Sequence, residues 1–308
     1  MNELNIQKYE SILNLLNTVG KIIENDSDYS EFYFKNQLAR YFQSLMIIEN
    51  CFKPATVLDV GSYPSHIHKM LLMMGYDVYG VDMDPNRISP GLNDCKNRTY
   101  KIDIERSGWN LGEKKYDIIL FLEVMEHLHV NPFVVFDELE NLIKKDGYLF
   151  LSTPNLLSMK NRINFVSGRY VFEHPFSVYE KLERHGSRGH QRLYSVNEIE
   201  DILDVYGYSI TNKWCLNESS PLLNQHKISK NLNSDFDFER FLGFFSSSFS
   251  WRGKLKIKIE NLMNNLFCSF YNTIFIVAKK KNAFDKDKVI NKIKKSDPWV
   301  SIEKFQLK

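Results

Sequence analysis

The sequence predicts an α/β fold in which helices cover both faces of a mostly parallel sheet. Short apolar runs alternate with segments of helical periodicity, and this alternation is typical of strand–helix–strand units. The first apolar run, Val57–Val60, ends at a glycine turn, and the next, Val78–Asp82, ends in an acid. With 308 residues and 43% hydrophobic content, the chain is long enough for one large domain with additions.

The separate elements follow from the same periodicities. Apolar side chains at helical spacing predict two helices, at 5–24 and 28–50, ahead of the first strand. Strands are then expected at 56–60, 77–82, 98–102, 116–122, 147–152, 208–216 and 272–279, with helices at 65–74, 131–145 and 196–206. Residues 281–308 are rich in lysine and lack an apolar rhythm, so we expect a loosely held tail there.

Composition narrows the class of protein. The 40 basic and 38 acidic residues leave a net charge of +2, which gives no strong signal for a nucleic-acid partner. The four cysteines lack C-x-x-C spacing, so we expect reduced thiols rather than a disulfide framework or a zinc site. No apolar run is long enough to span a bilayer, and residues 1–5 lack the pattern of a targeting signal. These features favour a cytoplasmic location and a small-molecule partner, and they leave the oligomeric state open.

The turn after the first strand is the most informative local feature. A glycine at the end of a buried strand lets the backbone approach a ligand, and an acid at the end of the next strand can accept hydrogen bonds from a ribose diol. Gly61 and Asp82 stand at these positions, which suits a cofactor that contains adenosine. The dinucleotide fingerprint G-x-G-x-x-G is not matched, because Tyr63 and Ser65 follow Gly61. A nicotinamide cofactor is therefore a remote alternative, and a cofactor without phosphates fits better.

A second motif follows the fourth strand, where Glu123–Leu128 reads E-V-M-E-H-L. A third is the segment Gly147–Asn155, which contains the fifth strand. Together with the glycine turn, these motifs resemble the class I S-adenosylmethionine-dependent methyltransferases. Within that family they resemble the branch of ubiquinone-biosynthesis O-methyltransferases and of tailoring enzymes for sugars and natural products. The family's first motif, D-x-G-x-G-x-G, is matched at Asp59 and Gly61 but not at the two later glycines. The resemblance covers about residues 55–210.

The resemblance implies a Rossmann-like fold with a seven-stranded, mostly parallel sheet whose last strand, Thr273–Ala278, runs antiparallel. From the resemblance together with the periodicities described above, we expect an N-terminal helical cap at 1–54, a methyltransferase domain at 55–280 with lid or substrate insertions at 153–194 and 217–271, and the tail at 281–308. Basic and apolar residues alternate from Trp251 to Met263 in the second insertion. Four aromatic residues lie just before this stretch, Phe241, Phe244, Phe245 and Phe249. We expect an aromatic cap over the pocket, and a membrane-surface or partner-binding element is the alternative.

The resemblance also implies the cofactor S-adenosyl-L-methionine and a set of residues that bind it. These are Asp59, Gly61 and Ser62 at the methionine end, Asp82 and Met83 at the ribose, Asp103 and Ile104 at the adenine, and Glu123 after the fourth strand. The simpler alternatives are an ordinary turn without a ligand at Asp59 and an acidic surface turn at Asp103.

The acceptor is expected to meet the segment 153–194, because a connection of this length in a compact domain is usually functional. Its candidate substrate-binding residues are Arg162, His185, Arg192 and Tyr194, and the arginines suit a phosphate, a carboxylate or an acidic sugar. Histidine is a suitable base for a hydroxyl acceptor because its pKa lies near neutrality. We expect His190 to be the base, with His127 as the second candidate, in O-methylation of a sugar, a sugar nucleotide or a biosynthetic intermediate.

Two other functions stay open. Glu123, Glu126, His127 and His190 have side chains that suit a divalent metal, and small-RNA ribose 2′-O-methyltransferases combine E-x-x-E-H with further histidines. Leu128 and the balanced charge count against that metal-dependent reaction on RNA, and we expect no metal. The incomplete glycine motif also permits a non-catalytic, cofactor-binding scaffold.

Overall fold

The computed structural model describes residues 3–24, 28–185, 189–216 and 272–296. Its centre is one seven-stranded sheet in the order β3-β2-β1-β4-β5-β7-β6. The strands are β1 Thr56–Val60, β2 Asp77–Asp82, β3 Thr99–Lys101, β4 Tyr116–Leu122, β5 Ile143–Pro154, β6 Tyr208–Leu216 and β7 Thr273–Lys280. Neighbouring strands pair in parallel except for β7, which runs antiparallel to both β5 and β6. The predicted fold class, including the antiparallel last strand, is confirmed.

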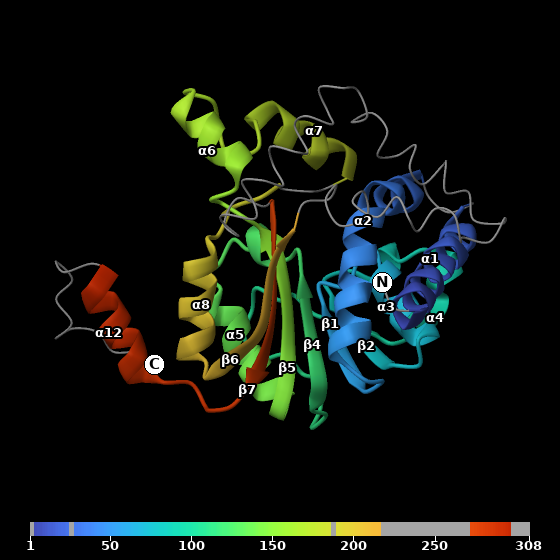
Figure 1. Cartoon of the computed structure of the whole chain (residues 1–308), viewed down its shortest axis with the longest axis horizontal. Helices are drawn as coiled ribbons and strands as arrows, with labels where there is room; N and C mark the ends of the chain where they lie inside the picture. The colour runs from blue at the N-terminus through green and yellow to red at the C-terminus, as the bar shows by residue number, and fades with distance from the viewer. Residues whose placement is uncertain (1–2, 25–27, 186–188, 217–271, 297–308) are drawn as a thin grey trace.

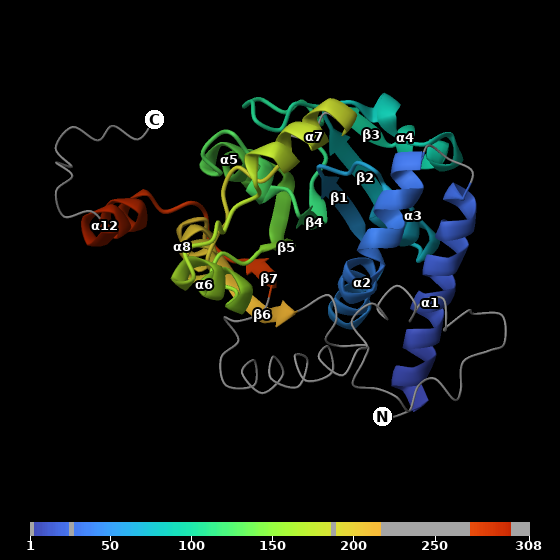
Figure 2. The same cartoon turned by 90° about the horizontal axis from the view of Figure 1, so that it is seen from above.

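Helices cover both faces of the sheet (Figures 1 and 2). One face carries α1 Glu3–Ile23, α2 Asp28–Cys51, α3 His66–Met73 and α4 Asn93–Lys96, and the other carries α5 Phe133–Leu142 and α8 Val196–Val205. Among the described connections, short 3₁₀ turns lie at Pro85–Arg87, Pro90–Leu92 and Met125–His127. Two further helices, α6 Met159–Val166 and α7 Pro175–His185, lie above the carboxyl ends of the parallel strands. The chain reverses its direction across the sheet between β1 and β4, which is where open α/β sheets bind ligands.

The central strands alternate between two hydrophobic clusters. In β5, Phe150 packs with α1, α2 and α3, whereas Leu149 and Leu151 pack with α5 and α8. Successive strand residues point to opposite faces, so a strand that is covered on both sides needs apolar residues throughout. The continuous apolar run Ile118–Leu122 in β4 is explained by this burial.

The helix predicted at 131–145 is shorter in the structure. It ends at Leu142, and β5 begins at Ile143. The pairing with β4 then jumps from Ile143 to Tyr148, which leaves a bulge between them. Asp146 in this bulge has a φ of 64°, which an α-helix does not allow.

The prediction of a loose tail is wrong for residues 286–296. This part forms α12 Lys286–Ser296, which contacts α8. Val289 is buried, and Lys288 Nζ lies 2.7 Å from a carboxylate oxygen of Asp204. Some of the lysines that suggested a tail, such as Lys288 and Lys292, form ion pairs with acids of α8, and others are exposed. Residues 297–308 lie outside the described part of the chain.

The composition predicts reduced cysteines and no membrane-spanning segment. Cys51, Cys95 and Cys215 are free thiols, and the latter two are buried, whereas Cys268 lies outside the described residues. Within the described ranges, no helix has both the length and the apolar character needed to cross a bilayer.

We predict that Leu45→Ala lowers the free energy of unfolding by about 2–5 kcal/mol, because it removes most of a fully buried side chain and leaves a cavity in its place. Leu45 on α2 is 0% exposed and lies in the cluster that joins α1 and α2 to the sheet. Urea denaturation would measure the change. The control is Leu182→Ala on α7, where leucine is 43% exposed and the loss should stay below about 1 kcal/mol. Equal effects of the two substitutions would contradict a shared core.

Candidate active site

A cavity of about 1800 Å³ opens at the carboxyl edge of the sheet. The turns after β1, β2, β3 and β4 form its floor, and its walls come from α2 and from the segment that carries α6 and α7. Thr273 at the start of β7 also reaches it. The motifs that lie far apart in the sequence therefore meet around one space.

The glycine turn after β1 has the predicted shape. Gly61 adopts a φ of 71°, and a Cβ at this position would lie 2.7 Å from Val124 Cγ2. Both facts require glycine here. The Gly61 amide donates to the carbonyl of Val81 at 2.9 Å, which fixes the turn against β2.

Asp82 ends β2 on the cavity floor. Its Oδ2 accepts a hydrogen bond from the Tyr63 amide at 3.1 Å, and its Oδ1 accepts one from the Asp84 amide at 3.0 Å. Two backbone amides therefore orient the carboxylate, and each oxygen keeps a lone pair for the hydroxyl of a ligand.

Asp103 follows β3 and lines the same cavity. Its Oδ1 accepts from the Glu105 amide at 3.1 Å, and its Oδ2 lies 3.0 Å from Arg106 Nε. Ile104 and Met83 line the cavity beside the two acids. The predicted ribose and adenine residues thus lie on one surface.

Asp59 and Ser62 lie behind the cavity wall rather than on it. Their exposed fractions are 6% and 5%, and neither lines the cavity. Burial, together with the negative charge of Asp82, raises the pKa of Asp59 to about 7. Ser62 packs against Gly80, where a Cβ would lie 2.6 Å from the serine Oγ. Both side chains support the loop from behind.

Glu123 directly follows β4 and has a φ of 56°. Hydrogen bonds orient its carboxylate from two sides. Its Oε1 accepts from the Ser152 hydroxyl at 2.8 Å, and its Oε2 accepts from Arg40 Nη1 at 2.9 Å. Burial alone would lower the pKa of Arg40, but Tyr33, Glu123 and Tyr41 together hold it above its ordinary value. The guanidinium therefore stays charged, and α2 is tied to the E-V-M-E-H-L motif.

Glu126 is 1% exposed and only half satisfied. Its Oε2 accepts from the Thr153 hydroxyl at 2.9 Å, whereas Oε1 has no hydrogen-bond partner among the described residues. Burial and then the charge of Glu123 raise the pKa of Glu126 well above its ordinary value. A buried carboxyl oxygen without a partner is costly, so this atom is well placed to receive a cation or a donor group.

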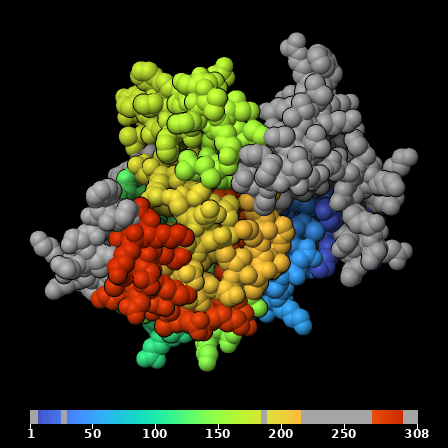
Figure 3. All heavy atoms as spheres, turned by 60° about the vertical axis from the view of Figure 1, so that its left-hand side comes forward, coloured from blue at the N-terminus to red at the C-terminus, as the bar shows by residue number. Residues whose placement is uncertain are grey.

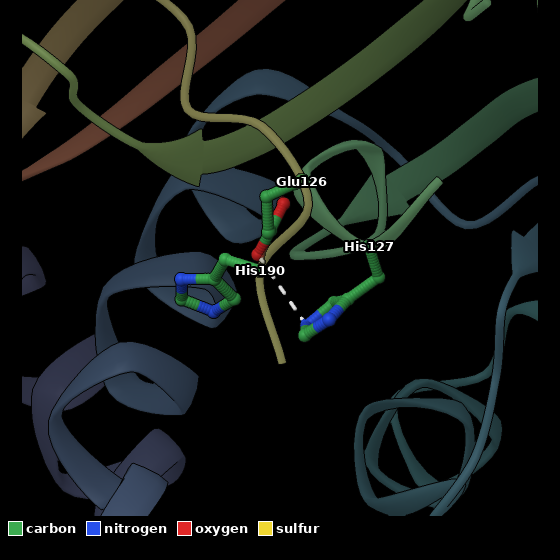
Figure 4. Close-up of side chains that lie close together, drawn as sticks. All are labelled: Glu126, His127 and His190. Atoms are coloured by element: carbon green, nitrogen blue, oxygen red, sulfur yellow. Dashed lines mark ion pairs between the residues drawn. The ribbon is translucent and has the colours of Figure 1, made fainter. Parts of the chain in front are cut away.

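His127 and His190 face each other beside Glu126 (Figure 4), with ring centroids 4.8 Å apart. His127 Nδ1 lies 2.8 Å from the Gly189 carbonyl. A carbonyl oxygen only accepts, so Nδ1 carries the proton and Nε2 is the acceptor nitrogen of the neutral ring. Burial lowers the pKa of both histidines, and His127 adds to this effect at His190. The His190 amide donates to Glu173 at 3.0 Å.

These three side chains form the one metal-compatible group found among the described residues. Ligand atoms of Glu126, His127 and His190 lie within 4.8 Å of one another, and His127 Nε2 is 3.9 Å from Glu126 Oε1 (Figure 4). One carboxylate and two imidazoles suit zinc or manganese.

The other predicted substrate residues are not brought to the cavity. Arg192 pairs with Glu198 at 2.6 Å and lies 5.0 Å from the ring of Tyr194, which is 2% exposed. Arg162 donates from Nε to a nearby backbone carbonyl at 2.7 Å. The side chain of His185 falls outside the described part of the chain. Arg192 and Tyr194 therefore contribute to the start of α8.

One set of cavity residues was not expected from the sequence. Tyr33, Asn36, Gln37 and Arg40 on α2 all line the cavity. Their spacing of three, four and seven residues places them on one helical face. Polar side chains that recur at helical spacing in this part of the sequence were the available signal.

The family described as "Methyltransferase domain" matches residues 29–213. This range is more than half of the chain and includes α2. The sequence motifs had placed the start of the resemblance at about residue 55, and that limit was too late.

Curated relatives and solved structures agree with this match. The chain is 24% identical over 188 residues to a ubiquinone biosynthesis O-methyltransferase of Glaesserella parasuis, covering 58% of this chain and 75% of the relative. It is 26% identical over 172 residues to one of Rickettsia bellii, covering 53% and 69%. The crystal structure of a SAM-dependent methyltransferase from Archaeoglobus fulgidus shares the fold with a TM-score of 0.51 at 17% identity, covering 82% of this chain and 100% of that one.

We predict a pH-dependent effect of Asp59→Asn on stability. The folded protein binds the Asp59 proton more tightly than the unfolded chain, because the pKa rises from 3.8 to about 7 on folding. The free energy of unfolding of the wild type should therefore fall by a few kcal/mol as the pH rises through this window. Asp59→Asn removes that fall, so its stability relative to the wild type should increase between about pH 4.5 and about pH 8.

Urea denaturation at the two pH values measures the difference. Asp117→Asn is the matched control, because a hydrogen-bonded Lys144 helps to hold the pKa of Asp117 below its ordinary value against the effect of burial. The stability of Asp117→Asn relative to the wild type should not increase between about pH 4.5 and about pH 8. A pH-independent difference between Asp59→Asn and the wild type would contradict the prediction.

Proposed function

Since the chain belongs to the family of methyltransferase domains, we propose that it uses S-adenosyl-L-methionine to methylate an oxygen atom of a small polar acceptor. The observation that carries this proposal is the pair of acids, Asp82 and Asp103, at the ends of adjacent strands on the floor of one cavity. The backbone amides that orient Asp82 leave its oxygens free to accept from a ribose diol.

The cavity floor also fits the charge of this cofactor. Asp82, Asp103 and Glu123 line it, and carboxylates favour a ligand that carries a sulfonium and an ammonium group. Gly61 lines the cavity with its backbone, so a ligand can approach the turn closely. Asp59 and Ser62 would act by shaping this loop.

The cofactor supplies a methyl group that is already activated, so the protein must place the acceptor and take its proton. We assign the role of base to His190, with His127 as the second candidate. Both residues line the cavity, and the lowered pKa of each favours the neutral ring, which is the state that accepts a proton. His127 presents its acceptor nitrogen because Nδ1 is held by the Gly189 carbonyl.

Transfer to oxygen is supported by the names of the curated relatives, which are O-methyltransferases at 24–26% identity. Asn155, Asn161 and Asn164 add polar side chains to the cavity, which suits a sugar, a sugar nucleotide or a polar biosynthetic intermediate. The segment 153–194 would act as the lid over this acceptor.

A second candidate is metal-assisted transfer, which the cluster of Glu126, His127 and His190 favours. A divalent cation would pair with the unsatisfied Glu126 oxygen and lower the pKa of a coordinated acceptor hydroxyl. An RNA ribose is one such acceptor, and binding to RNA would fall steeply with salt.

We predict that S-adenosylhomocysteine binds the purified protein, and that Asp82→Ala weakens this binding at least about tenfold, because two charge-assisted hydrogen bonds are lost. Isothermal calorimetry measures both constants. Asp94→Ala is the control, since Asp94 lies outside the cavity and pairs with Lys69. Absence of binding to the wild type would contradict the proposed function. Binding without turnover across a broad acceptor panel would favour a non-catalytic scaffold.

We predict that His190→Asn lowers kcat by about 10²–10⁴-fold with little change in cofactor affinity, because it removes the base. Steady-state kinetics would measure this loss, with an acceptor identified from the panel of candidate acceptors. Treatment with a chelator separates the two candidates. Activity that survives the chelator supports His190 as a base, whereas activity that is lost and then restored by added manganese or zinc supports the metal-assisted reaction. Full activity of His190→Asn would exclude both roles for this residue.

A further inference from the structure

Charged residues of both signs line the cavity. The floor carries Asp82, Asp103 and Glu123, which fit the cationic cofactor, and the wall carries Glu173 and Glu180. The segment 156–172, which includes α6, contains three basic residues and no acidic residue. Two of them, Lys160 and Arg169, line the cavity. Figure 3 shows α6 and α7 standing above α8 and α12 at the surface of the molecule.

The cations near the cavity floor are already engaged. Arg40 lies 2.9 Å from Glu123, and Arg106 lies 3.0 Å from Asp103. Arg87 stacks on the ring of Tyr63, with its guanidinium carbon 4.2 Å from the ring centroid. These groups neutralise or orient the floor.

Lys160 and Arg169 differ from these cations. Neither takes part in an ion pair, a side-chain hydrogen bond or a cation–π contact with any other described residue, although both are exposed to the cavity. Farther along the same wall, Lys181 pairs with Glu173. Two cations thus remain available to a ligand.

Hydrogen bonds fix the backbone that carries the two cations. Ser158 caps α6 by accepting from the Asn161 amide at 3.3 Å, and Asn161 donates back to the carbonyl of Asn155 at 3.0 Å. Lys160 and Asn164 lie four residues apart on one helical face. The Arg169 amide donates to the Asn164 carbonyl at 2.7 Å, which brings Arg169 back to this helix.

We propose that Lys160 and Arg169 form a subsite for an anionic group, a phosphate or a carboxylate, on the acceptor; this inference rests on the proposed methyl transfer. Arginine binds such groups through paired N–H donors, and lysine adds a compact charge. These two cations, together with the carboxylates of the floor, would also orient an anionic acceptor, with its charged end directed away from Asp82 and Asp103 and toward α6.

Paired probes test the subsite. Calorimetry compares glucose 6-phosphate with glucose, and 3,4-dihydroxybenzoate with catechol, each with and without S-adenosylhomocysteine. For one or both pairs, the wild type should bind the anionic probe at least about tenfold more tightly than the neutral probe. The phosphate pair and the carboxylate pair distinguish the two anionic groups.

Two double variants carry the comparison. Lys160→Met/Arg169→Met should lose the preference for the anionic probe and keep the affinity for S-adenosylhomocysteine within about twofold. Lys53→Met/Lys145→Met removes the same charge from exposed positions outside the cavity and should keep the preference. Thermal unfolding confirms that each variant is folded.

Two outcomes overturn the inference. One is a wild type that binds neither anionic probe in preference to its neutral partner. The other is a preference that persists in Lys160→Met/Arg169→Met. Failure of the proposed function would be seen separately, because the wild type would then not bind S-adenosylhomocysteine. The probe titrations without that ligand would still report on the subsite.

Discussion

The partly buried ion pair between Arg40 and Glu123 is the constraint on which the site depends. Glu123 and Glu126 lie on one turn after β4, where the Glu123 side chain is 11% exposed and Glu126 is buried. Two carboxylates so poorly solvated repel each other, and a nearby cation lowers the cost of keeping them together. Arg40 on α2 supplies the counter-charge. Helix α2 therefore contributes to the candidate active site as well as to the core.

Polar residues at the end of β5 extend this arrangement. Ser152 donates to Glu123, and Thr153 donates to Glu126, so adjacent residues of one strand orient both acids of the neighbouring strand. The carbonyl of Glu126 then accepts from the Gln191 amide at 2.7 Å, which holds His190 beside His127. Pairing between β4 and β5 thus sets the positions of the acids directly and of the histidines through one further contact.

The sheet could be predicted because its central strands are buried on both faces, so they read as apolar runs such as Ile118–Leu122. The floor acids followed from position, since Asp82 ends β2 and Asp103 comes shortly after β3. Arg40 could not be found this way, because its partner lies 83 residues away and only the packing of α2 brings them together. The bulge before Tyr148 was missed for a similar reason: strand pairing overrides the local helical pattern there.

The reversed direction of β7 has a consequence for how the chain can change. Because β7 runs antiparallel to β6, Leu216 at the end of one strand pairs with Thr273 at the start of the other, and this junction is on the cavity's side of the sheet. A segment inserted there is closed at its base by the sheet itself, and loop-closure entropy rises only slowly with length. The connection at this junction can therefore change in length without disturbing the strands that hold the floor of the cavity.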